Sequence, residues 1–274
     1  MTLSPLLQAY DQVILDLDGC VWIGDEPVSG SPEAIAALRA AGKRVAFATN
    51  NSWHPPEDQV AKLWRHGVQA SLGDVVTVGG ALQHLLNETR RGRSAFVIGG
   101  ASLHANVADA GLRVLNGSDD AERADVVVMG GTDDVTYDDL RVATLAARRS
   151  GDLLATARDP TLPMPGGHWP GTGALLAAVE TASGVTGQIV GKPQPQLFHT
   201  AIDRLGERRT LVVGDRLDSD IAAATAAGLD GALVLSGGMT PDEAAAATSR
   251  DDAPQPVAIA ADLRALVLAD GRQT

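Results

Sequence analysis

Short apolar runs alternate with longer helical patterns along most of the chain, and this alternation constrains the fold more than any other feature. The runs 13–15 and 210–213 are mostly or wholly apolar, as expected of parallel strands that helices cover on both faces. The segments between runs carry helix signals, such as Ser31-Pro32-Glu33 at a start and Gly42 just past an end. The pattern predicts an α/β fold with a doubly wound, mostly parallel sheet.

The expected strands form two series, which predicts two domains. One series comprises residues 13–15, 45–48, 210–213 and 232–234, and the other comprises residues 95–98, 125–128 and 153–155. We therefore expect residues 1–78 and 184–274 to form a core domain, with residues 79–183 inserted as an α/β cap. A length of 274 residues fits one main domain that carries such an insertion.

Composition narrows the possible partners and location. The chain has 22 Lys and Arg against 34 Asp and Glu, a net charge of −12 that disfavours nucleic acid or an anionic membrane as a partner. Neither a signal peptide nor an apolar run of membrane-spanning length is recognisable. The single cysteine, Cys20, suits a reducing cytoplasm, and we expect it to be a small buried core residue rather than a redox-sensitive thiol.

Two aspartates, Asp16 and Asp18, follow the first expected strand in the string Asp16-Leu17-Asp18-Gly19. Residues two apart on a strand project to the same side, and open α/β sheets bind ligands at the carboxyl ends of their strands. Two carboxylates this close repel each other unless a cation or a shared proton intervenes. An ordinary Asp-rich turn is the alternative interpretation.

A second acidic segment follows the strand that ends at Gly214 and contains Asp215, Asp218 and Asp220. Asp218 and Asp220 could simply cap the next helix and complement its dipole, whereas Asp215 lies before that helix. If the two strands are neighbours, Asp215 converges with the aspartates of the first strand. Such a set of hard oxygen ligands suits Mg²⁺.

Two further segments, one of uncharged polar residues and one that contains a lysine, could bind an anion. Thr49-Asn50-Asn51-Ser52 follows another strand and is either a polar turn or a donor of hydroxyl and amide groups to phosphate. Lysine occurs only at Lys43, Lys62 and Lys192, and the other 19 basic residues are arginine. Lys192, in Gly191-Lys192-Pro193, is either a surface loop residue or a compact charge placed between two anions.

In this order, the four segments look like the four motifs of the haloacid dehalogenase superfamily of phosphohydrolases. The insertion resembles the large α/β cap of its class IIA branch, which includes para-nitrophenyl-phosphatase-like, nucleotide, pyridoxal-phosphate, glycerol-phosphate and phosphoglycolate phosphatases. The strings that favour this branch are Ala48-Thr49-Asn50-Asn51-Ser52, Gly191-Lys192-Pro193 and Gly214-Asp215-Arg216-Leu217-Asp218-Ser219-Asp220-Ile221. The resemblance covers roughly residues 10–270.

The resemblance implies a Mg²⁺-dependent phosphomonoesterase that hydrolyses small phosphorylated metabolites through a phosphoaspartate. Asp16 would be the nucleophile and Asp18 the general acid and later the base. Relatives often pair through their caps, so a homodimer is a further expectation. The implied catalytic residues are Asp16, Asp18, Thr49 and Lys192; the implied substrate-binding residues are Gly19, Thr49, Asn50, Asn51, Lys192 and Asp159; and the implied Mg²⁺ ligands are Asp16, Asp18 through its backbone carbonyl, Asp215 and Asp220.

Other activities on the same fold are weighed against this one. A dehalogenase would have no use for Asp18, and a phosphomutase fits the large cap poorly. A non-catalytic protein that binds a phosphorylated ligand would be expected to have lost a charged core residue, and the sequence retains all of them.

Within the cap, Asp159 is either a substrate contact or a turn residue before Pro160, and Arg158 departs from the usual pattern of the branch. The expected cap loops carry no residue-level code for the substrate, so its identity stays open.

The aromatic residues and the remaining lysines carry further expectations. Trp22, Trp53 and Trp169 fall beside the motifs and form either an apolar collar around the pocket or packing between cap and core. We expect Trp64 to be a core residue on its helix, and Lys43 and Lys62 to be exposed.

Overall fold

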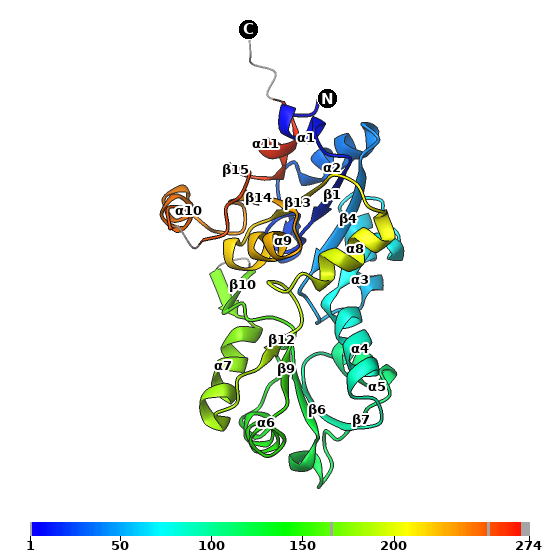
Figure 1. Cartoon of the computed structure of the whole chain (residues 1–274), viewed down its shortest axis with the longest axis vertical. Coiled ribbons are helices and arrows are strands. Elements are labelled where there is room, and N and C mark those ends of the chain that lie inside the picture. The colour runs from blue at the N-terminus through cyan, green and yellow to red at the C-terminus, as the bar shows by residue number, and fades with distance from the viewer. Residues whose placement is uncertain (1, 165–166, 251–252, 270–274) are drawn as a thin grey trace.

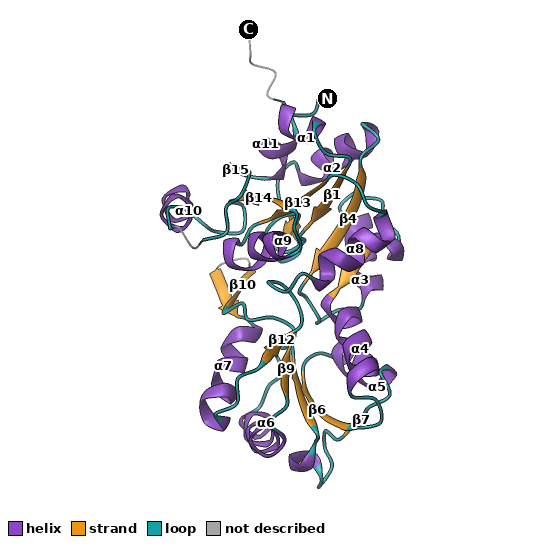
Figure 2. Cartoon of the chain, in the orientation of Figure 1, coloured by secondary structure: helices purple, strands orange, loops and turns teal. Residues whose placement is uncertain are grey.

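Two separate parallel sheets form the framework of the computed structural model, which describes residues 2–164, 167–250 and 253–269 (Figure 1). The larger sheet has six strands in the order β15-β14-β13-β1-β4-β5, and the second has five in the order β12-β9-β8-β6-β7. Helices flank both sheets (Figure 2). The α/β fold with parallel strands that the sequence predicts is therefore confirmed.

In the larger sheet, β1 is central and is buried on both faces. Val13 and Leu15 pack in one apolar cluster while Ile14 packs in another, so the three positions after Gln12 are apolar on both faces of the strand. β1 pairs with β13 on one side and β4 on the other, which brings the residues after these three strands together. The strands are β1 (Gln12–Leu15), β4 (Arg44–Thr49), β5 (Val75–Thr77), β13 (Thr210–Gly214), β14 (Asp230–Val234) and β15 (Ala258–Ala260).

Helices cover the two faces of this sheet with separate apolar clusters. One face is covered by α1 (Pro5–Gln8), α2 (Ser31–Ala40), α3 (Pro56–Arg65) and α11 (Leu263–Val267). The other is covered by α8 (Gln196–Leu205) and α9 (Ala222–Ala226), the latter preceded by a π-helical turn, η3 (Leu217–Ile221). Helix α10 (Pro241–Thr248) packs against η3 and β14 through Ala244.

The second sheet is covered by helices in the same way. Its strands are β6 (Ser94–Ile98), β7 (Arg113–Val114), β8 (Val126–Met129), β9 (Leu153–Ala155) and β12 (Gln188–Ile189). Helices α6 (Tyr137–Ser150) and α7 (Thr172–Ser183) lie on one face, and α4 (Val78–Thr89) and α5 (Ala101–Asp109) lie on the other. The apolar residues of α4 and α5 belong to the same cluster as those of α8 and α9, so one continuous core joins the two sheets.

Two antiparallel hairpins stand outside these sheets. The hairpin β2 (Trp22–Ile23) to β3 (Glu26–Pro27) follows Asp18 closely. The hairpin β10 (Thr161–Met164) to β11 (Gly167–Pro170) extends from the second sheet toward the larger one, near α9 in Figure 1. Its His168 lies against Gly238, where an added Cβ would be 3.0 Å from the histidine Nε2. The hairpin therefore reaches the loop that follows β14.

Two expectations about buried and exposed residues are wrong, and one is confirmed. The Trp64 side chain is 54% exposed rather than in the core, and its indole N–H donates to the carbonyl of Ala70. The Lys62 side chain is only 16% exposed, and its ammonium lies over the Trp22 ring with Nζ 4.5 Å from the ring centre. Cys20 is fully buried in the core, as predicted.

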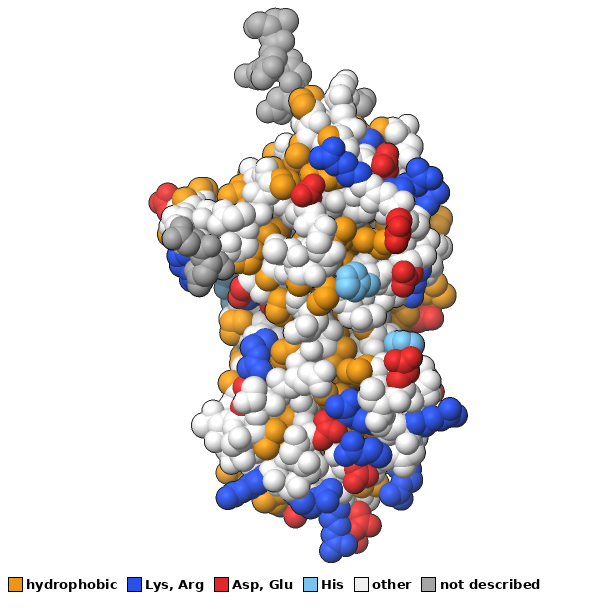
Figure 3. All heavy atoms as spheres, viewed as in Figure 1, with side chains coloured by type: hydrophobic (Ala, Val, Ile, Leu, Met, Phe, Trp, Pro, Cys, Tyr) orange, Lys and Arg blue, Asp and Glu red, His pale blue; other side chains and the backbone are white. Residues whose placement is uncertain are grey.

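Charged side chains of both signs are interspersed on the face shown in Figure 3, and basic ones gather near its lower end. At the start of the second sheet, Arg90 and Arg93 both pair with Asp152, at 2.9 and 3.1 Å.

Among the described residues the longest helix is α6, with 14 residues, and no helix is both long and apolar enough to cross a bilayer.

Candidate active site

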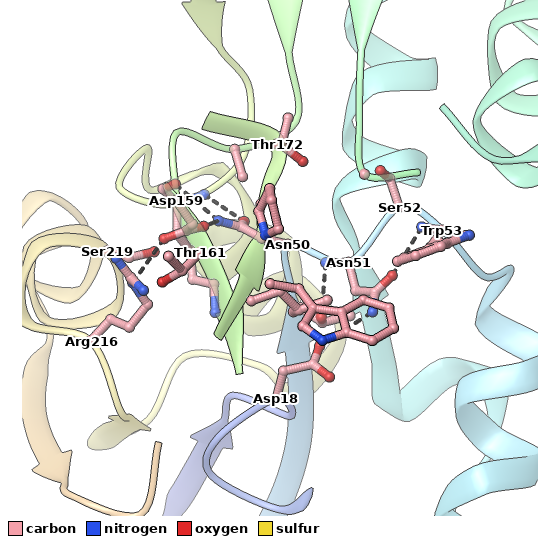
Figure 4. Close-up of a pocket in the computed structure, with 18 of the residues that line it drawn as sticks. Asp18, Asn50, Asn51, Ser52, Trp53, Asp159, Thr161, Thr172, Arg216 and Ser219 are labelled. Carbon is pink, nitrogen blue, oxygen red and sulfur yellow. Dashed lines mark hydrogen bonds and ion pairs between the residues drawn. The ribbon is translucent and has the colours of Figure 1, made fainter. Parts of the chain in front are cut away.

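The carboxyl ends of the two sheets face each other across a cavity of about 330 Å³. Residues that follow β1, β4 and β13 line one side, and residues that follow β8 and β9, together with the β10–β11 hairpin, line the other (Figure 4). The cavity brings together nearly every site residue that the sequence predicts, with the exception of Gly19. The residues brought together are Asp16, Asp18, Thr49, Asn50, Asn51, Asp159, Lys192, Asp215 and Asp220.

Lys192 is buried between two carboxylates at the base of this cavity. Its Nζ lies 2.5 Å from Asp16 Oδ1 and 2.6 Å from Asp220 Oδ1, and the side chain is 3% exposed. The Asn50 side chain fixes the backbone of the lysine, because its Oδ1 accepts from the Lys192 N–H at 2.8 Å and its Nδ2 donates to the Lys192 carbonyl at 3.0 Å. Of the two interpretations of this rare lysine, the structure shows a charge between anions.

Burial and charge act against each other in this group. Burial raises the pKa of Asp16 to about 8, with Lys192 opposing the rise and Asp220 adding to it. Burial lowers the pKa of Lys192, but the charges of Asp16 and Asp220 outweigh it and the net shift is upward. The lysine is therefore held in its charged form, and the neighbouring carboxylates need positive charge to ionise together.

Three of these buried carboxylates could hold a metal ion. One oxygen each from Asp16, Asp215 and Asp220 lies within 4.8 Å of the others. Burial raises the pKa of Asp215 well above its usual range, and the charges of Asp220 and Asp16 add to that rise. A divalent cation would offset the mutual repulsion of these carboxylates, and hard oxygen donors are what Mg²⁺ prefers. The donor set therefore fits Mg²⁺.

Two glycines leave room for the carboxylate of Asp215. A Cβ at Gly19, whose φ is +87°, would lie 2.3 Å from Asp215 Oδ2, and a Cβ at Gly237 would lie 1.7 Å from the same oxygen. Gly19 thus shapes the site from outside the cavity lining. Sequence reasoning missed Gly237, whose one signal is a Gly-Gly pair after an apolar strand.

Asp18 is held at the cavity wall by side chains from two elements. The Trp22 indole N–H donates to its Oδ1 at 2.9 Å, and Asn51 Nδ2 lies 3.4 Å from its Oδ2. Trp22 is 1% exposed and does not line the cavity, so it belongs to the packing beneath the site. Trp53 and Trp169, in contrast, do line the cavity.

An ion pair joins the two sides of the cavity. Asp159, which follows β9, has a carboxylate oxygen 2.9 Å from Nε of Arg216, the residue next in sequence to the candidate metal ligand Asp215 (Figure 4). Asp159 also accepts a hydrogen bond from the Asn50 side chain at 3.4 Å. Burial raises the pKa of Asp159, and Arg216 opposes the rise. Sequence reasoning missed Arg216, whose only signal is its place beside Asp215. Arg158 is absent from the lining because it pairs with Glu180 at 2.8 and 2.9 Å.

Comparison with known proteins places the chain in a family. Residues 13–113 match the model of haloacid dehalogenase-like hydrolases, and residues 189–266 match a second, HAD-hydrolase-like model. An acid sugar phosphatase of Staphylococcus aureus is 32% identical over 84% of this chain and 88% of its own length. The chain therefore belongs to the haloacid dehalogenase-like hydrolases, and the family predicted from the motifs is confirmed.

Relatives with described activities are phosphatases. A D-glycerol 3-phosphate phosphatase of Mycobacterium tuberculosis is 37% identical over 86% of this chain, which spans 65% of the length of that relative. The crystal structure of a glycerol phosphate phosphatase from the same organism, in complex with magnesium, superposes with a TM-score of 0.83 at 36% identity, over 95% of this chain and 78% of that one. The predicted phosphatase class and Mg²⁺ requirement agree with these relatives.

We expect Gly237→Ala to weaken Mg²⁺ binding by about 10- to 100-fold, because the new methyl group would displace Asp215 from the carboxylate cluster. Isothermal titration calorimetry of the metal-free protein with Mg²⁺ measures this without any substrate. Gly73→Ala is the matched control, since a Cβ there meets its nearest atom at 3.6 Å. Equal affinity in the two variants would contradict the assigned role of Gly237.

Proposed function

We propose that this protein is a Mg²⁺-dependent phosphomonoesterase that hydrolyses small phosphorylated metabolites through a phosphoaspartate on Asp16. The observation that carries the proposal is the buried contact of Lys192 with Asp16, 2.5 Å apart, beside two more carboxylates that a metal ion could bridge. A carboxylate can attack a phosphate dianion only where positive charge offsets the repulsion between them.

The two aspartates after β1 take different roles in this mechanism. Asp16 attacks phosphorus, and the bond from phosphorus to the leaving oxygen breaks. Asp18 donates its proton to that oxygen, then accepts a proton from the water that cleaves the phosphoaspartate. The hydrogen bond from Trp22 supports this role, since it fixes the direction in which the Asp18 carboxyl points.

Asp16, the backbone carbonyl of Asp18, Asp215 and Asp220 would hold Mg²⁺, which supplies positive charge to the transferring phosphoryl group when bound. Asp220 also accepts from Lys192 at 2.6 Å and from the backbone N–H of Arg216 at 3.1 Å. It therefore couples the lysine to the carboxylate cluster.

The polar residues after β4 would hold the phosphate oxygens. Thr49 is 1% exposed and lines the cavity, and its Oγ1 accepts from the backbone N–H of Asn51 at 3.0 Å. That contact leaves the threonine hydroxyl proton available for a phosphate oxygen. Both ends of the Asn50 amide already bind Lys192 and Asp159, so we assign Asn50 to positioning these two residues.

Several expectations from the sequence stand beside this function as proposals. We propose the division into a core and an inserted cap that begins at residue 79. The return boundary expected after residue 183 is moved to follow Ile189, because β12 pairs with β9 of the second sheet. A homodimer through the cap and a cytoplasmic location are proposed on the sequence resemblance and the single cysteine. The non-catalytic alternative is disfavoured because the five charged motif residues remain and share one cavity, namely Asp16, Asp18, Lys192, Asp215 and Asp220.

Asp16→Asn is expected to lower kcat for para-nitrophenyl phosphate by at least about a thousandfold, because the amide cannot act as the nucleophile. Asp218→Asn is the matched control, since this carboxylate is 76% exposed and lies outside the main cavity. EDTA should silence the wild-type enzyme and added Mg²⁺ should restore it. Full turnover in Asp16→Asn would remove this residue as nucleophile, and indifference to EDTA would remove the metal.

Lys192→Arg should lower kcat/KM for the same substrate by at least about 100-fold although it keeps the charge. The planar fork of arginine cannot occupy a buried space shaped for one ammonium between two carboxylates. Lys43→Arg, outside the cavity, serves as control. Near wild-type activity of Lys192→Arg, with an unchanged circular dichroism spectrum, would contradict the assignment.

Trp22→Phe should lower kcat by about 10- to 100-fold with a smaller change in KM, because Asp18 loses the donor that orients it. Trp64→Phe makes the same change at an exposed site and should leave kcat as it is. If the two variants behave alike in steady-state kinetics, Trp22 only fills space in the core.

A further inference from the structure

The cavity has a surplus of negative charge that extends beyond the proposed metal site. Among the described residues that line it, six are carboxylates and only two are cationic. The cations are Lys192 and Arg216, and the carboxylates are Asp16, Asp18, Asp133, Asp159, Asp215 and Asp220.

Both cations already face carboxylates of the chain. Lys192 lies between Asp16 and Asp220, and Arg216 lies beside Asp159 at 2.9 Å. With Mg²⁺ held by the carboxylate cluster, the positive charge at the base of the cavity would bind the phosphate group of the substrate. No cation among the described lining residues is left for a second anionic group on the substrate.

The opposite side of the cavity, where the rest of a substrate would lie, is mainly apolar with a few polar groups. Leu162 and Trp169 supply apolar surface, and Asp133 and Asp159 supply carboxylates. A carbon chain fits such surroundings, whereas a carboxylate or second phosphate would be desolvated next to like charge.

Within the described part of the chain, the buried Nε–H of Arg216 has no hydrogen-bond partner, because its contact with Asp159 is not aligned for one. A nitrogen with no accessible surface cannot contact a group on the substrate, so this nitrogen is not available to a second anion either.

We infer that the Asp159–Arg216 pair selects phosphate monoesters whose leaving group is an uncharged alcohol, and rejects esters whose leaving group carries a second negative charge. This inference rests on the proposed phosphomonoesterase activity. It makes Asp159 and Arg216 specificity-determining residues on opposite sides of the cavity, and it separates phosphate esters of uncharged alcohols from phosphorylated hydroxy acids.

Two substrates of nearly equal size test the inference. 2-Hydroxyethyl phosphate and 2-phosphoglycolate differ only in a CH₂OH group against a carboxylate. With Mg²⁺ and the full-length wild-type chain, kcat/KM is expected to be at least about 100-fold higher for 2-hydroxyethyl phosphate. Equal values, or a preference for phosphoglycolate, would overturn the inference without any variant being made.

Asp159→Asn assigns the selectivity to the pair, because it removes the charge, keeps the shape and leaves Arg216 able to receive an anion. The ratio of the two kcat/KM values should fall by about tenfold or more. Asp218→Asn is the matched control. Asp218 also pairs with the Arg216 side chain, at 3.6 Å, but it lies outside the main cavity, and the ratio should stay within about twofold of wild type. An unchanged ratio in Asp159→Asn, or an equal fall in both variants, would overturn the assignment to Asp159.

Hydrolysis of para-nitrophenyl phosphate separates this inference from the proposed function. If wild-type protein with Mg²⁺ hydrolyses neither that ester nor either of the pair, the proposed function fails. If it hydrolyses para-nitrophenyl phosphate but does not discriminate within the pair, the function stands and the inference fails.

Discussion

The burial of one ammonium group between two carboxylates is the constraint on which the site depends. A buried charge without a partner costs several kcal/mol, so Lys192 can be 3% exposed only because Asp16 and Asp220 lie within 2.6 Å of its Nζ. That arrangement requires β1 to lie beside β13, because Asp16 follows one strand and Asp220 lies just past the other. The order of the strands in the sheet is therefore also required to bring the charged residues of the site together.

The same lysine links the second sheet to the site. It lies on the segment that returns from β12, and the Asn50 amide holds its backbone while also contacting Asp159 after β9. Three segments far apart in the chain therefore meet at one amide side chain. The apolar cluster shared by both sheets stabilises this arrangement of the two sheets, since α4 and α5 pack with α8 and α9. Residues that face the leaving group are in this way fixed relative to residues that face the phosphate.

How much of this could be predicted from the sequence depends on how local each feature is. Asp16, Asp18 and Asp215 could be placed because each directly follows an apolar strand, and parallel neighbours bring such ends together. The contacts of Trp22 with Asp18 and of Arg216 with Asp159 were missed, since nothing in the pattern shows which distant side chains come within hydrogen-bond distance. Trp64 and Lys62 were misplaced for a related reason. The exposed and buried sides of α3 depend on partners outside it, namely the Ala70 carbonyl for Trp64 and the Trp22 ring for Lys62.

The net charge of −12 has two parts, one on the solvated surface and one buried at the site, and they differ in their physical meaning. Most of it is solvated surface, where acidic and basic side chains lie among one another and cost little. Asp16, Asp215 and Asp220 are buried within 4.8 Å of one another, and apolar side chains would fill their positions at a lower cost in folding free energy. A group of charges that weakens the fold in isolation is expected at a site where bound ligands offset it. In this protein the lysine offsets part of that charge permanently, and the remainder accounts for a site that favours a metal cation and a phosphate ester over any further anion.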